Sequence, residues 1–254
     1  MNKQKEEVKY GEINPSFGCC HSKRLRDVFG SEIKILIILR DPVKRVWSNF
    51  NHCINEGEPV MLDKAKNTQY LQKQDRAEIF DEILKDNFVK ENGQWIYTGT
   101  YNHFLTGMRY SFFINQYLKF FSKENIKIIL FEELIKEQRR ICREIVEFLE
   151  VPFQENLNYQ IKANEGDHAP ADEASKCMIE RYNRSLKRIK KDGGDSLKIG
   201  EAYERLQKER TKFFQPVKIG NMSVFAEALL RKYLHSDKLY AEEILQRDLT
   251  DIWF

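Results

Sequence analysis

Long apolar runs are missing from this sequence. No window of the 254 residues approaches the roughly eighteen consecutive apolar residues that a membrane-spanning helix needs. The opening stretch MNKQKEEVKY is polar and lacks the apolar segment of a signal peptide. A strong charge of one sign is missing too, because 42 Lys and Arg residues stand against 39 Asp and Glu residues, for a net charge of +3. These absences argue against a membrane partner and against nucleic-acid binding through bulk charge.

Cysteine is sparse and irregularly placed. The 5 cysteines have no metal-ligand spacing, and the adjacent Cys19 and Cys20 are poorly placed to pair with each other. We therefore expect reduced thiols, no metal cofactor and a cytoplasmic location. A Gly-x-x-x-x-Gly-Lys-Ser loop is also absent, which disfavours a kinase or a similar nucleotide-binding α/β enzyme.

What the sequence does contain is an apolar strand followed at once by a helix. Residues 33–39 are apolar and β-branched, which is typical of a strand buried on both faces. Asp41 suits the N-cap of the next helix, and Pro42 suits its first turn. Apolar residues then recur at helical spacing and form one stripe: Val43, Val46, Trp47, Phe50, Cys53 and Ile54.

The remaining pattern predicts one α/β domain over residues 1–254. A second buried strand is predicted near 126–131. Helices are predicted at 76–88, 102–121 and 135–149, and polar or aromatic-rich loops at 56–74 and 91–101. The order strand, helix, helix, strand, helix indicates a parallel sheet with crossover helices. We divide the domain into a core (10–155), a charged helical segment (156–229) and closing helices (230–254).

Two polar residues flank the start of the first long helix. Arg40 follows the strand at its carboxyl end, where open α/β sheets bind ligands, and Ser48 lies two turns into the helix. The polar face that carries Ser48 is predicted to include Lys44, Arg45, Asn51 and His52. A guanidinium and a hydroxyl that converge suit a dianionic phosphate, since charged hydrogen bonds contribute about 1.5–3 kcal/mol. The alternative is that Arg40 pairs with a nearby carboxylate and Ser48 faces water.

The phrase KILIILRDPVKRVWSNF resembles the 3′-phosphate-binding segment of sulfotransferases that use 3′-phosphoadenosine 5′-phosphosulfate (PAPS). The closest resemblance is to the heparan-sulfate sulfotransferases and their bacterial relatives. Segments 10–17 (YGEINPSF), 99–137 and 230–253 are similar to further family segments in the same order, whereas 156–229 carries no such motif. The resemblance implies a three-layer, P-loop-type α/β fold with a central parallel sheet flanked by helices.

The resemblance also implies roles for four residues. Arg40 and Ser48 would hold the 3′-phosphate of PAPS. Glu12 falls on the family's catalytic base, and His103 falls on a histidine near the acceptor and the sulfonate. Alternatively, Glu12 is an exposed carboxylate before a turn and His103 is a hydrogen-bonded core residue. In the family, sulfuryl transfer is an in-line displacement that needs no metal, with a base at the acceptor and cationic donors at the developing charge.

The sequence departs from the family pattern before Glu12. In the family, a strand and a Lys-x-Gly-Thr-Thr-type loop that wraps the 5′-phosphosulfate precede this glutamate. Only 11 residues precede Glu12 here, and Ile13 and Asn14 stand where Lys-Ser is usual. We therefore expect an N-terminally truncated fold whose first apolar strand has an open edge that invites self-association. The alternative function is an inactive remnant that binds a 3′-phosphoadenosine nucleotide, or a partner, without catalysis.

The acceptor is expected to be a hydroxyl or amine of a carbohydrate or another small molecule. Trp95, Tyr97 and Tyr101 are placed to stack on sugar rings, although core positions would suit them equally. The basic run Lys187, Arg188, Lys190 and Lys191 offers a further alternative, a nucleic-acid or anionic-glycan binder, although a charge run is most often a solvated helix face. Within the family that the sequence resembles, an acidic acceptor glycan is the more natural partner of this run.

Overall fold

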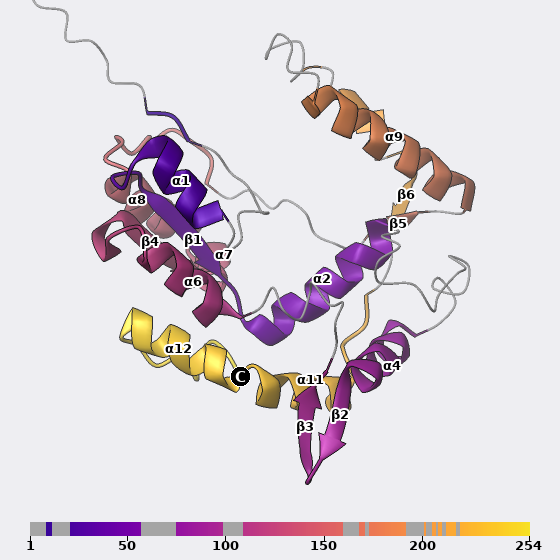
Figure 1. Cartoon of the computed structure of the whole chain (residues 1–254). Helices are drawn as coiled ribbons and strands as arrows, with labels where there is room; N and C mark the ends of the chain where they lie inside the picture. Colours follow the sequence, from indigo (N-terminus) through magenta and orange to yellow (C-terminus); the bar gives the residue numbers. More distant parts are fainter. Residues whose placement is uncertain are drawn as a thin grey trace, which may run out of the picture. The chain divides into compact units, whose positions relative to one another are not determined.

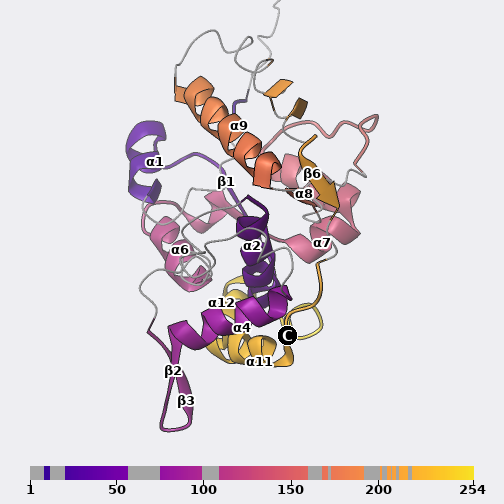
Figure 2. The same cartoon turned by 90° about the vertical axis from the view of Figure 1, so that its right-hand side faces the viewer.

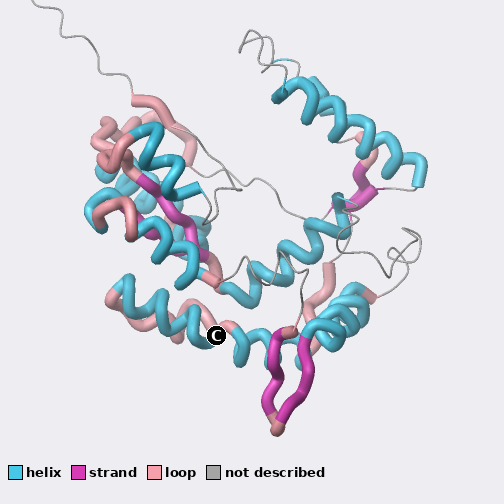
Figure 3. The backbone as a smooth tube through the Cα atoms, in the orientation of Figure 1, coloured by secondary structure: helices cyan, strands magenta, loops and turns pink. Residues whose placement is uncertain are grey.

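The structure is a computed structural model. It describes residues 9–11, 21–56, 75–98, 109–159, 168–170, 173–191, 201, 205–206, 208–209, 212–216 and 219–254. Helices dominate and the strands are short (Figure 3). The elements used below are α1 (Ser22–Phe29), β1 (Ile35–Leu39), α2 (Pro42–Glu56), α4 (Arg76–Asn87), β2 (Phe88–Glu91), β3 (Gln94–Tyr97), α6 (Tyr110–Leu118), β4 (Ile126–Leu130), α7 (Phe131–Lys136), α8 (Gln138–Phe148), β5 (His168–Pro170), α9 (Glu173–Lys191), β6 (Phe214–Pro216), α11 (Val224–Tyr233) and α12 (His235–Leu245) (Figure 1).

The chain forms two compact units. The first comprises Met1–Arg45, Leu105–Lys162 and Leu234–Phe254, and the second comprises Val46–Phe104 and Ala163–Tyr233. Each unit is therefore built from segments that are distant in the sequence. The prediction of one domain with three consecutive parts stays a prediction.

The first unit is built on a parallel strand pair. β1 pairs with β4 in register from Ile35 opposite Ile126 to Leu39 opposite Leu130. Within the described residues this sheet has 2 strands. The predicted α/β class, with a parallel sheet flanked by helices, is confirmed.

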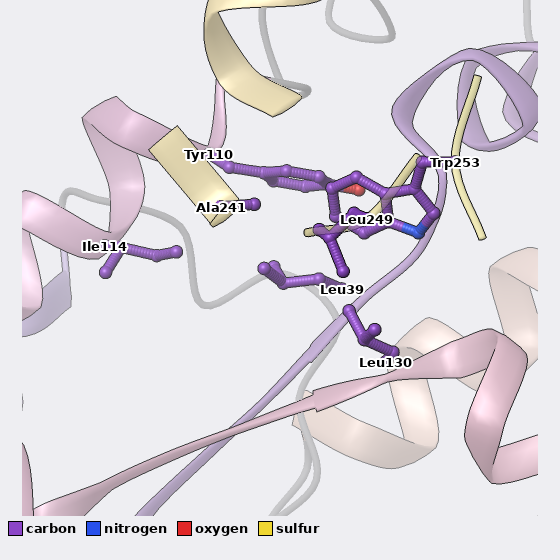
Figure 4. Close-up of a cluster of buried hydrophobic side chains, with 7 residues drawn as sticks. All are labelled: Leu39, Tyr110, Ile114, Leu130, Ala241, Leu249 and Trp253. Atoms are coloured by element: carbon purple, nitrogen blue, oxygen red, sulfur yellow. The ribbon is translucent and has the colours of Figure 1, made fainter. Parts of the chain in front are cut away.

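One face of the strand pair carries the main core of this unit. Its side chains pack against α6, α12 and the C-terminal segment, and Figure 4 shows the Tyr110 and Trp253 rings next to each other. The buried members of the cluster are Leu39, Tyr110, Ile114, Leu130, Ala241, Leu249 and Trp253. Non-polar burial of this kind contributes about 25 cal/mol per Å² of surface removed from water.

The other face is covered unevenly, which corrects one prediction. Residues 33–39 were expected to be buried on both faces, but Leu36 is 36% exposed and Ile38 46% exposed. On β4, the same face contacts α8, and Ile129 is only 4% exposed. An apolar strand sequence such as that of β1 therefore does not predict which face of the strand is covered by a helix.

The second unit begins within α2. The apolar stripe of this helix is buried as predicted at Val46, Phe50, Cys53 and Ile54. Phe80 of α4 contacts both Trp47 and Phe50, with ring centroids 5.2 and 4.7 Å apart. The periodicity of α2 thus indicated its buried side correctly.

A β-hairpin follows α4, where part of a loop was predicted. β2 and β3 pair antiparallel around Asn92 and Gly93, whose φ angles of 48° and 79° are both positive. Asn-Gly is the strongest short hairpin signal in a sequence, so the turn was readable and was missed. Figure 2 shows α4 and α11 side by side near this hairpin, and the two helices are in contact.

Candidate functional site

Arg40 lies directly after β1, at the carboxyl end of the strand. Its guanidinium stands over the Phe131 ring, 4.9 Å from the centroid. Phe131 directly follows β4, and parallel pairing brings the two strand ends together because Leu39 is opposite Leu130. In the part of the chain that the structure describes, Arg40 forms no ion pair with a carboxylate. The guanidinium thus lies at the carboxyl edge of the strand pair, the edge at which open α/β sheets bind ligands.

The backbone at Arg40 is held by Tyr110. The Tyr110 hydroxyl donates a hydrogen bond to the Arg40 carbonyl oxygen at 2.7 Å, and the Arg40 N–H approaches the same hydroxyl at 3.4 Å. Burial raises the pKa of the Tyr110 phenol, which keeps this group a neutral donor. The Arg45 guanidinium lies 5.6 Å from the centre of the same ring, so Arg45 contacts the core as well as solvent.

Asp41 forms the N-cap of α2, as its position predicted. Its Oδ1 accepts from the N–H groups of Val43 and Lys44 at 2.9 and 3.2 Å. Lys44 Nζ lies 3.6 Å from Oδ2. Burial nevertheless raises the pKa of the Asp41 carboxyl, and the neighbouring Glu132 adds a smaller effect in the same direction.

Ser48 is an exposed residue of α2 in the second unit, whereas Arg40 belongs to the first. Their joint use in one phosphate site stays a prediction. The predicted polar face around Ser48 is wrong for Asn51, which is 2% exposed. The Asn51 amide donates to the Trp47 carbonyl at 2.8 Å and accepts from Arg76 at 2.8 Å. Asn51 therefore joins α2 to α4 instead of facing solvent.

Of the other predicted site residues, the structure describes Trp95 and Tyr97. Glu12 and His103 lie outside the described residues, and so does Tyr101. Trp95 packs edge-on against Phe225, with centroids 5.8 Å apart. Tyr97 lies between Phe88 and Tyr233, at 5.3 and 5.5 Å. Tyr97 is thus a packing residue of the hairpin, which was one of the two alternatives.

Glu132 was missed in the sequence, although its position resembles that of Arg40. Both residues lie just beyond the carboxyl end of a parallel strand. One Glu132 oxygen accepts from the Asp41 N–H at 2.9 Å, and the other accepts from the Trp253 indole at 3.1 Å. The strand-end rule that singled out Arg40 applied equally to Glu132.

The described part of the chain shows neither a cluster of metal ligands nor a membrane-spanning helix. Among the described residues, no group of three or more His, Cys, Asp or Glu side chains is arranged to hold a metal ion. No described helix combines the length and the apolar character needed to cross a bilayer.

These features define an α/β protein with a candidate anion site at the carboxyl edge of a parallel strand pair. Residues 21–165 match the family model described as "Sulfotransferase domain". The chain therefore belongs to the sulfotransferase domain family, which confirms the resemblance of the strand–Arg–Asp–Pro segment. This family is one of transferases that move a sulfuryl group.

A comparison with solved structures found a sulfotransferase from Alicyclobacillus acidocaldarius. The two chains are 17% identical with a TM-score of 0.46, over 91% of this chain and 61% of that one. The chain thus spans 61% of the length of that protein. No match was found among curated proteins.

Proposed function

We propose that this protein transfers a sulfuryl group from PAPS to a hydroxyl or amine of an acceptor, with a carbohydrate as the expected acceptor class. The observation that carries the proposal is Arg40, which stands over Phe131 at a strand end inside the family match of residues 21–165. An arginine that stacks on a ring keeps the edge of its guanidinium available for bidentate contact with a phosphate.

The proposed reaction is an in-line displacement at sulfur. Glu12 removes the proton from the acceptor as its oxygen or nitrogen forms a bond to sulfur. The bond between sulfur and the bridging phosphate oxygen breaks, and adenosine 3′,5′-bisphosphate leaves with the electron pair. Arg40 and Ser48 hold the 3′-phosphate of that nucleotide, and His103 lies near the sulfonate in this proposal. The reaction needs no metal.

Three further assignments belong to the same proposal. Trp95 is only half-buried, so in this proposal it stacks on a sugar ring of the acceptor. On α9, Arg188 is exposed, as are Arg181 and Arg184, so an acidic glycan is a consistent acceptor. A cytoplasmic location also stays a proposal.

Ligand-induced stabilisation tests the donor assignment. Adenosine 3′,5′-bisphosphate at one hundred times its Kd should stabilise the native state by about 2.7 kcal/mol and raise the melting temperature accordingly. Arg40→Ala should remove most of this shift and leave weak residual binding, and Ser48→Ala should remove a smaller part of it. Arg184→Ala, which removes an exposed arginine on α9, is the matched control and should leave the shift unchanged.

Sulfate transfer from radiolabelled PAPS tests catalysis separately. The catalytic proposal is supported if the wild type turns over PAPS and Glu12→Gln loses this turnover while it still binds the nucleotide. Nucleotide binding without any turnover favours the non-catalytic remnant. Equal melting shifts in the wild type and in Arg40→Ala would reject Arg40 as the phosphate ligand.

A further inference from the structure

Glu132 is bound by two donors that come from opposite ends of the chain. It lies in the first turn of α7, directly beyond β4, and is half-buried. Its Oε1 accepts from the Asp41 N–H at 2.9 Å, and its Oε2 accepts from the Trp253 indole N–H at 3.1 Å. Both partners are donors without acceptor capacity, so the site requires a group with two acceptor oxygens.

The Asp41 N–H belongs to the same peptide group as the Arg40 carbonyl. That carbonyl accepts the Tyr110 hydroxyl at 2.7 Å. The peptide group is planar, so a hydrogen bond at each of its two ends fixes its orientation. Glu132 and Tyr110 therefore hold the peptide group between Arg40 and Asp41 from its two opposite edges, as a clamp. This peptide group is attached directly to the Cα atom that carries the Arg40 side chain.

The C-terminal segment supports this clamp. Trp253 is 1% exposed and lies beside Tyr110, with ring centroids 6.0 Å apart (Figure 4). The adjacent carboxylate, Glu133, pairs with Arg247 at 2.7 Å. Two neighbouring carboxylates of α7 thus bind residues from the last turns of the chain, but only Glu132 also reaches the Arg40–Asp41 peptide.

We propose that Glu132 is a positioning residue for the phosphate site. By holding the Arg40–Asp41 peptide, it directs the Arg40 guanidinium over Phe131 and toward an incoming 3′-phosphate. This inference rests on the proposed role of Arg40 in binding the donor nucleotide. A side chain held in place before binding loses less conformational entropy on binding, so the loss of the clamp weakens phosphate affinity without removing a ligand contact.

The test measures nucleotide affinity by titration calorimetry. Glu132→Gln has one acceptor oxygen and one amide donor, so one of the two N–H groups is left facing another donor. We expect affinity for adenosine 3′,5′-bisphosphate to fall about five- to tenfold. Affinity for adenosine 5′-monophosphate, which lacks the 3′-phosphate, should change less than about twofold.

Three further variants separate positioning from general stability. In the Arg40→Ala background, Glu132→Gln should cause no further loss of affinity, since it acts through Arg40. Tyr110→Phe removes only the hydroxyl on the other edge of the peptide and should show the same selective loss. Glu133→Gln alters the neighbouring carboxylate, which does not reach the peptide, and should leave both affinities unchanged.

The outcomes are distinct. The inference is supported if Glu132→Gln lowers affinity for the bisphosphate but not for the monophosphate, and if it has no such effect in the Arg40→Ala background. Binding by the wild type with no change in Glu132→Gln and Tyr110→Phe overturns the positioning role and leaves the donor proposal intact. An equal loss of affinity for both nucleotides, or a loss of affinity that persists in the Arg40→Ala background, also overturns the positioning role. Either result indicates a general structural role for Glu132. If the wild type does not bind the bisphosphate, the donor proposal fails and the positioning role fails with it.

Discussion

The strands β1 and β4 are similar in sequence and paired side by side, yet their environments differ along their length. Ile38 and Ile129 are cross-strand partners on one face, and they are 46% and 4% exposed. One residue further on, Leu39 and Leu130 are partners on the other face, and both are 2% exposed. The two strands therefore differ in side-chain exposure on the face where α8 contacts β4. Their exposure is the same at the carboxyl ends, next to Arg40 and Glu132. Burial in this unit follows the placement of helices, and it is symmetric at the end that carries the candidate site.

The largest expected effect tests the uneven face directly. Ile129→Ala should lower the free energy of unfolding by about 2–5 kcal/mol, because it leaves a cavity between β4 and α8. Ile38→Ala, its matched control, should cost less than about 1 kcal/mol, because much of that side chain is already in water. Urea unfolding of both variants measures the difference. Equal losses would mean that the exposed face of β1 is covered in solution.

The next effect concerns Asp41, at the end where the strands are alike. Asp41→Ala removes the cap of α2 and should cost about 1 kcal/mol, whereas Asp41→Asn retains a capping oxygen. Burial raises the pKa of the Asp41 carboxyl in the folded state above its usual value of 3.8. The protonated Asp41 side chain therefore contributes its full stability below pH 3.8, and this contribution is lost as the pH rises through the pKa of the folded state.

The pH dependence of Asp41→Asn follows from that sign. The stability of the asparagine variant relative to the wild type should increase as the pH rises above 3.8 and then level off. Chemical denaturation at several pH values measures this difference. A relative stability that decreases with rising pH would show that the carboxylate is stabilised, rather than destabilised, by its surroundings.

A smaller effect tests how α8 covers β4. Lys127 shares a strand face with Ile129, and its Nζ lies 3.5 Å from a carboxylate oxygen of Glu144 in α8. Both side chains are partly exposed, so a double-mutant cycle with Lys127→Met and Glu144→Gln should give a coupling energy of about 0.2–1 kcal/mol. A coupling energy near zero, even at low salt, would show that the apolar contact alone places α8 here.

The smallest stability effect is expected at Leu36, on the open part of β1. Leu36→Lys should change the free energy of unfolding by no more than about 0.5 kcal/mol, since its side chain already reaches solvent. The new charge should instead slow aggregation or dimerisation, because exposed apolar strand surface favours association. Light scattering against protein concentration measures this. A large loss of stability would contradict the exposure of Leu36, and unchanged scattering would reject self-association through this face.

Local features of the site region were readable from the sequence. The N-cap at Asp41 depends on the N–H groups of residues two and three positions away, so it follows from short-range rules. The burial of Val46 and Phe50 follows from helical period in the same way. The hairpin turn at Asn92 and Gly93 is equally local, because the Asn-Gly pair itself favours the positive φ angles of such a turn.

Other features depended on contacts that no local rule supplies. Asn51 lies next to polar neighbours in the sequence, but Arg76 draws it into the contact between two helices. Glu132 lies 121 residues from Trp253 and 91 residues from Asp41, so neither spacing could indicate the clamp. The positions of Glu12 and His103 stay predictions, because both lie outside the described residues.

The sequence by itself determined the parallel α/β class, the strand that directly precedes Arg40, the capped helix that follows, and the sulfotransferase family. Each of these depends on periodicity, capping or an ordered set of motifs, which are properties of neighbouring residues. Only the tertiary structure decided which face of β1 is open and that one peptide after Arg40 is held between Tyr110 and Glu132. The physical reason is that helix coverage and hydrogen-bond partners across the fold depend on where distant segments pack, and residue type alone does not specify that packing.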